Sequence, residues 1–216
     1  MMKSAQDTSA LIRSLAREAT EKEPPQGLRF HRLLLLAAGF SLMLSIALAL
    51  GVFGIRPNLP AVLAGTPFLF KFATMLLLAA GGLALVRRAG EPGTGSSAWM
   101  MLIPGFLVLA MGLALDSSGF PLLGRHGGAV PSCVGAIVLL SLPALAAGLS
   151  VLKRGVPVQP LRAGLAAGFL AGTIGGAAYA FVCKNDGALF VAIWYGLAIV
   201  IVATLGALIG RKALAW

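Results

Sequence analysis

The chain has 216 residues, of which 58% are hydrophobic and 11% are charged, and its formal net charge is +10. A soluble domain of this size carries about a quarter charged residues, so the composition argues against a water-soluble fold. No basic run is interleaved with aromatic residues, which disfavours direct binding of nucleic acid. The charges instead separate long apolar stretches, each close to the roughly 20 residues with which a helix crosses a bilayer.

The first segment, residues 1–32, is predicted to be a polar cytoplasmic tail. It lacks the apolar core and small-residue cleavage site of a signal peptide. Within it, Leu11, Ile12, Leu15 and Ala16 share one face at helical spacing, which predicts a short amphipathic helix. A helix of about three turns is unstable alone in water. It is therefore expected to fold on a partner protein or, as the alternative, on the inner leaflet of the membrane.

The second segment, residues 33–216, is predicted to be an all-α bundle of six transmembrane helices. Their approximate limits are residues 33–53, 66–86, 97–115, 131–152, 161–181 and 188–210. The 17 Lys and Arg residues divide unequally between the two sides of this arrangement, and most of them lie on the side of the termini. The positive-inside rule therefore places both termini in the cytoplasm.

Ionisable residues are almost absent from the predicted spans. This scarcity disfavours proton relays, ion-coupled transport and hydrolysis within the membrane. Lys71 is the exception. It lies about one turn inside the outer end of its span, and its ammonium group is expected to reach the interface rather than to be buried.

Glycines recur every four residues along the fifth predicted span, at Gly164, Gly168, Gly172 and Gly176. Small residues at this interval form a groove that lets another helix approach closely. The pattern therefore predicts tight helix packing rather than a pore, because no polar residue supports a pore.

Two cysteines are predicted to lie at the outer membrane face, Cys133 at the start of the fourth span and Cys183 at the end of the fifth. Disulfides persist in oxidising compartments, and nearby cations such as Lys184 favour the thiolate. Three interpretations stay open. The pair is a redox or thiophilic-metal sensor with His126 and Asp186 as further candidate ligands, a permanent disulfide, or two unconnected thiols that act as small apolar residues.

Several segments in a fixed order carry a family resemblance. They are residues 11–16, Cys133, SLPAL at 141–145, RGVPVQP at 154–160, the glycine-rich fifth span, Cys183, WYG at 194–196 and GALIGRKALAW at 206–216. Through these segments the chain resembles the NrsF family, which are negative regulators of sigma-F-type extracytoplasmic-function sigma factors. The resemblance extends over nearly the whole chain. The resemblance implies a multi-pass anti-sigma factor of the bacterial inner membrane, with no enzymatic activity and no cofactor.

The resemblance also implies the partners and the sensing residues. The partners would be the lipid bilayer and a sigma factor, which the protein would release under oxidative or heavy-metal stress sensed at Cys133 and Cys183. Three other functions remain: a membrane thiol-disulfide oxidoreductase, a small transporter or channel, and a structural membrane subunit. The first usually needs a second cysteine pair, and the second needs polar residues inside the membrane.

Overall fold

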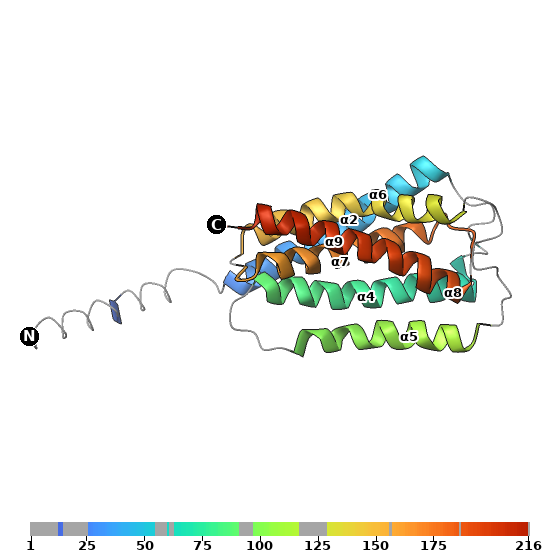
Figure 1. The fold of residues 1–216 in the computed structure, drawn as a ribbon, viewed down its shortest axis with the longest axis horizontal. Helices are drawn as coiled ribbons and strands as arrows, with labels where there is room; N and C mark the ends of the chain where they lie inside the picture. The colour runs from blue at the N-terminus through green and yellow to red at the C-terminus, as the bar shows by residue number, and fades with distance from the viewer. Residues whose placement is uncertain are drawn as a thin grey trace, which may run out of the picture.

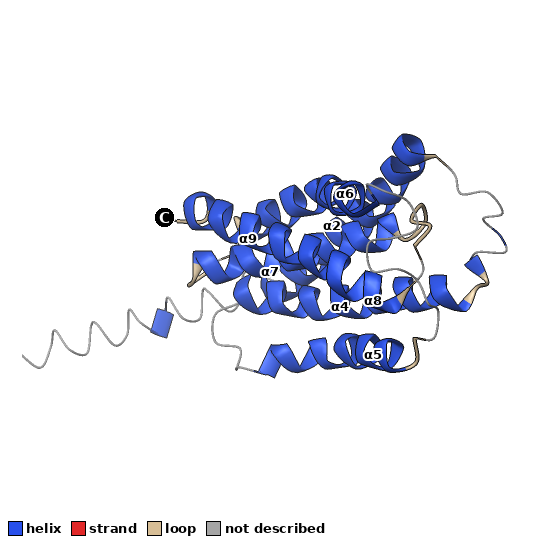
Figure 2. Cartoon of the chain, turned by 45° about the vertical axis from the view of Figure 1, so that its right-hand side comes forward, coloured by secondary structure: helices blue, strands red, loops and turns tan. Residues whose placement is uncertain are grey.

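The structure is a computed structural model that describes residues 13–14, 26–54, 60, 63–90, 97–116, 129–155, 157–185 and 187–215. All regular structure in these ranges is helical, as Figure 2 shows, so the predicted all-α class is confirmed. Five helices are long and apolar enough to cross a membrane. They are α2 (Gln26–Phe53), α4 (Thr66–Gly90), α6 (Ala129–Leu152), α7 (Pro160–Tyr179) and the stretch Ala188–Ala213, which joins α8 (Ala188–Phe190), the π-helix η2 (Val191–Tyr195) and α9 (Gly196–Ala213).

The third predicted span has a different form. It consists of the six-residue 3-10 helix η1 (Ser97–Leu102) and the 12-residue helix α5 (Ile103–Ala114). Pro104 lies in the first turn of α5, where its missing N–H is tolerated. Together the two helices reach about 30 Å, close to the thickness of the hydrocarbon core. The structure thus has one shorter apolar helix beside the five long ones, and six membrane crossings remain a prediction.

Helix α7 lies at the centre of the bundle. It packs against α2, α4, α6 and α9, and 78% of its span is buried, against 22 to 50% for the other four long helices. Helix α5 lies at the edge, beside α4 (Figure 1). The buried residues of α7 are mostly Gly and Ala. Because these side chains are small, several helices can pack closely around α7.

Three of the four spaced glycines of α7 face α9. Gly164 lies directly against the backbone of Gly206, and Gly172 lies against Ile199. A Cβ atom placed on Gly168 would lie 2.7 Å from the Cα atom of Ala203. The two helix backbones are therefore in contact, with no room for a side chain between them.

Helix α2 begins before the predicted boundary at residue 32. Its first residue is Gln26, and Phe30 in its second turn is buried. In the tail, Arg13 and Ser14 are helical and exposed. The four apolar tail residues that the sequence nominates lie outside the described residues.

One polar contact joins α2 to α6. The Ser45 hydroxyl donates a buried 2.8 Å hydrogen bond to the carbonyl oxygen of Leu140. We expect Ser45→Ala to lower the free energy of unfolding by about 1 kcal/mol, because the bond between helices is lost. Ser150 is the matched control, since its hydroxyl is exposed and bonds within its own helix to Ala146. Unfolding of both variants in mixed detergent micelles measures the difference, and equal destabilisation would contradict the prediction.

Candidate thiol site

Cys133 and Cys183 lie together at one end of the bundle. Cys133 is in the second turn of α6 and fully buried, and Cys183 is four residues beyond the end of α7 and 3% exposed. The two thiols are free and lie within hydrogen-bonding range of each other. Only residues 153–159 connect α6 to α7, so the two helices run antiparallel and the start of one lies beside the end of the other. This arrangement brings together two cysteines that lie fifty residues apart in the sequence.

Lys71 belongs to this site, and the expectation that it reaches the interface is wrong. Its side chain is fully buried. The ammonium group donates hydrogen bonds to the carbonyl oxygens of Cys183, at 3.3 Å, and Asn185, at 3.0 Å. The reason is that α7 ends at Tyr179 and α4 packs against it, so carbonyl groups beyond the last helical turn face Lys71. These acceptors replace the water that an ammonium group needs.

Two tyrosines complete the surroundings of the thiols. Tyr179 is the last residue of α7, and Tyr195 is the last residue of η2, with 6.0 Å between their ring centroids. Tyr195 is fully buried near Cys183, and its hydroxyl has no hydrogen-bond partner among the described residues. Single π-helical turns occur frequently at functional sites, because the wider turn redirects a side chain. Sequence reasoning nominated neither tyrosine, although Tyr195 lies within the WYG segment of the family resemblance.

The environment of Cys183 favours its thiolate. A hydrogen bond from the Cys133 thiol and the positive charge of Lys71 hold the pKa of Cys183 below its usual value, although burial acts in the opposite direction. Cys183 is therefore equipped to act as a nucleophile toward an oxidant, with Cys133 in position to close a disulfide.

In the described part of the chain, no group of three or more His, Cys, Asp or Glu side chains comes together that could hold a metal ion. His126 and Asp186, the other candidate ligands, lie outside the described residues. The described residues of the site form a dithiol.

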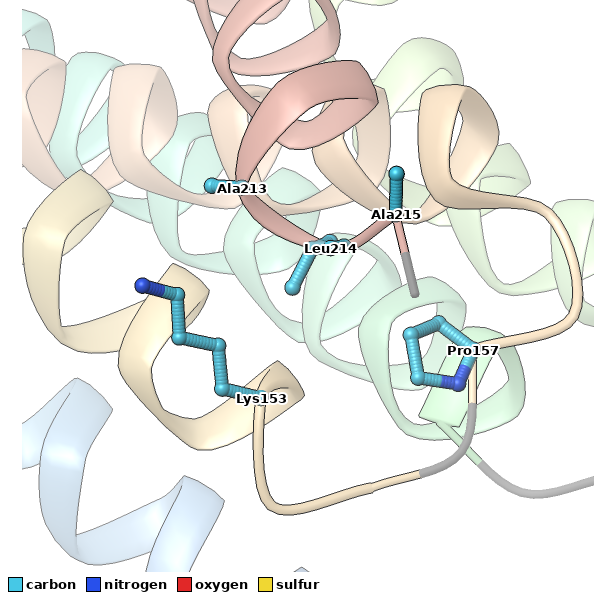
Figure 3. A pocket seen from close by; sticks show the side chains of 5 residues that line it. All are labelled: Lys153, Pro157, Ala213, Leu214 and Ala215. Atoms are coloured by element: carbon cyan, nitrogen blue, oxygen red, sulfur yellow. The ribbon is translucent and has the colours of Figure 1, made fainter.

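A pocket of about 290 Å³ lies at the other end of the bundle (Figure 3). Lys153 and Pro157 line it from the connection after α6, and Ala213, Leu214 and Ala215 line it from the end of α9. Figure 1 places the C-terminus at this end and α8 at the thiol end. The pocket and the thiols are thus separated by the length of the bundle.

Comparison with known proteins assigns the family. The sequence profile of the family described as "Negative regulator of sigma F" matches residues 18–216. The chain is 32% identical to a probable anti-sigma-F factor NrsF of Azospira oryzae and 33% identical to the anti-sigma-F factor NrsF of Caulobacter vibrioides. Each alignment covers 97% of this chain and 99% of the relative. No solved structure matches the chain significantly. With the profile and both relatives in agreement over nearly its whole length, the chain belongs to the NrsF family.

Proposed function

We propose that this protein is an anti-sigma factor embedded in the bacterial inner membrane. It holds an extracytoplasmic-function sigma factor of the sigma-F type at the cytoplasmic face and releases it when the thiol pair is oxidised. The observation that carries this proposal is that two free, buried thiols lie together beside the buried Lys71. The chain's relatives are named anti-sigma-F factors. The protein acts as a regulator and not as an enzyme.

The sensing chemistry is oxidation of the dithiol by a hydroperoxide. The Cys183 thiolate attacks the distal oxygen of the hydroperoxide, the O–O bond breaks, and the leaving alkoxide takes a proton from water. Cys183 is then a sulfenic acid. The Cys133 thiol attacks this sulfur, the disulfide bond forms, and the expelled hydroxide takes the Cys133 proton to leave as water. Two thiols are oxidised and one hydroperoxide is reduced to an alcohol and water.

The bond ties the start of α6 to the segment after α7. Helix α7 has little freedom to absorb a displacement, because its backbone lies directly on α9 at Gly164 and Gly168. Close-packed helices transmit a shift rather than deform continuously. The displacement therefore reaches the far end of α7, near the pocket beside Lys153 and Pro157. Release also requires the oxidised state to bind the sigma factor more weakly than the reduced state does.

The tail residues Leu11, Ile12, Leu15 and Ala16 are the proposed docking segment for the sigma factor. An amphipathic helix that is too short to be stable alone becomes ordered when its apolar face binds a groove. Basic residues lie at the same predicted membrane face, among them Arg87 and Arg88 at the end of α4. They would be next to the bound sigma factor and could attract its acidic residues.

Co-purification tests the proposal. We expect the full chain to capture a sigma factor encoded beside it under reducing conditions, and a chain without residues 2–25 to capture at least about tenfold less. This truncation stops before Gln26 and keeps α2 intact. A second pair separates docking from folding: Leu11→Asp with Leu15→Asp should abolish capture, whereas Arg13→Gln should not.

Each outcome has a definite reading. Capture by both the full chain and the truncation would move the docking site to the loops between the helices. Absence of capture by the full chain, reduced and free of added metal, would overturn the anti-sigma proposal for that partner.

A membrane thiol-disulfide oxidoreductase is the second candidate, and the thiolate-favouring surroundings of Cys183 are the observation in its favour. Such an enzyme would pass electrons from substrate thiols through Cys133 and Cys183 to a quinone. Repeated, quinone-dependent oxidation of thiols by the purified protein would support it. Formation of one disulfide per chain without turnover would exclude it.

A further inference from the structure

Lys71 is the single charged side chain that the described part of the chain buries. It lies in the second turn of α4, and two carbonyl oxygens fix its ammonium group, those of Cys183 at 3.3 Å and Asn185 at 3.0 Å. The first of these belongs to the residue whose thiol meets Cys133. A lysine at this depth of a membrane protein is energetically expensive and marks a functional site more often than a structural one.

We propose that Lys71 is the positioning residue of the thiol pair. Its ammonium group anchors the segment 183–185 to α4 and stabilises the negative charge on the Cys183 sulfur, so that Cys183 rather than Cys133 reacts first with the oxidant. The inference deepens the proposed function and rests on it, because it names the residue that prepares the sensing thiol. Lys71 itself touches no oxidant and forms no covalent bond.

The surroundings of the sulfur leave this role to Lys71. The titratable groups that face Cys183 in the described residues are Cys133 from α6, Lys71 from α4, Tyr179 from α7 and Tyr195 from η2. Lys71 is the cation among them. The other three are one thiol and two phenols. These are weak acids that carry no positive charge, so they cannot supply a full opposite charge in a buried site. Lys184, the next residue along the chain, is exposed, and solvent screens its charge.

The two carbonyl bonds explain why the charge stays in place. A free lysine side chain on a helix has many rotamers and is attracted to the membrane surface. Hydrogen bonds from the ammonium to both carbonyls restrict it to one position, beside the backbone of Cys183. The same bonds hold the segment after α7 in the conformation that places the Cys183 thiol against Cys133. Anchoring and charge stabilisation therefore have one structural cause.

Site-resolved alkylation measures the role directly. The full-length protein in detergent is treated with iodoacetamide between pH 5 and pH 9, and mass spectrometry quantifies modification at Cys183 and Cys133 separately. We expect Lys71→Gln to raise the pH at which Cys183 alkylation is half-maximal by about one unit or more, because glutamine keeps a donor for the carbonyls but has no charge. At pH 6 its rate at Cys183 should fall about threefold, since a higher pKa also makes each thiolate more nucleophilic.

Matched variants separate charge from structure. Lys71→Arg keeps the charge and should keep the half-maximal pH within about 0.3 units, and Lys184→Met, which removes an exposed charge beside Cys183, should do the same. Lys71→Met removes both charge and donor, and if it fails to fold, Lys71→Gln still decides the matter. An unchanged half-maximal pH, or faster alkylation at pH 6, in Lys71→Gln would overturn the inference. The measurement needs no sigma factor, so the anti-sigma proposal and this one can fail independently.

Discussion

Replacement of either cysteine is expected to lock the sigma factor onto the protein during oxidant exposure. For a complex formed under reducing conditions, we expect a hydroperoxide dose that releases most of the sigma factor from the native protein to release at least about tenfold less from Cys133→Ser and Cys183→Ser. The reason is that neither variant can form the bond between α6 and the segment after α7. Capture on the immobilised membrane protein, before and after the oxidant, gives the released fraction.

The two variants should differ in their chemistry although both retain the sigma factor. Cys133→Ser keeps the reactive thiolate, so a sulfenic acid should accumulate at Cys183 and react with a dimedone probe. Cys183→Ser should give little sulfenic acid, because the ammonium group of Lys71 is held at the backbone of residues 183 and 185 and not at Cys133. In the native protein, added reductant should restore binding. Undiminished release from both serine variants would contradict disulfide sensing and leave the sigma factor interaction itself intact.

The helices and the thiol pair could be predicted from the sequence for separate physical reasons. Long apolar stretches bounded by charge predicted the five long helices, because composition alone decides whether a segment suits hydrocarbon. The cysteines could be placed at the same end of the bundle because the connection between α6 and α7 is short. Their position at the same end did not predict that the two thiols would be in contact. Contact depends on the rotation of α6 about its axis, which is set by packing against α7.

The orientation of Lys71 and the role of Tyr195 could not be predicted in this way. A lysine one turn from a helix end has the same sequence context whether it faces lipid or protein, and only the position of α7 beside α4 decides between them. Tyr195 reaches Cys183 from the π-helical turn η2, which has no sequence signature. The third span, in turn, was predicted as a regular helix, but the described structure begins it with a 3-10 helix before Pro104.

The packing of α7 on α9 leads to the last prediction, a loss of stability in Gly168→Ala. The added Cβ atom would meet the carbonyl oxygen of Val202 and lie 2.7 Å from the Cα atom of Ala203. Both are backbone atoms, which cannot rotate away, so the helices must separate along part of their length. We expect the free energy of unfolding to fall by about 2 kcal/mol. Loss of helical circular dichroism in mixed micelles of rising dodecyl sulfate content measures it.

Gly39→Ala is the matched control, because Gly39 is an exposed residue within α2 and a Cβ atom there would meet nothing within 4 Å. Alanine has the higher helix propensity, so this variant should be unchanged or more stable by up to about 1 kcal/mol. Gly176→Ala should fall between the two, since its Cβ would press on the flexible end of Met75 at 2.9 Å rather than on backbone. If Gly168→Ala were as stable as Gly39→Ala, the α7–α9 contact would not be the close backbone packing described, and α9 could not restrain α7 when the disulfide forms.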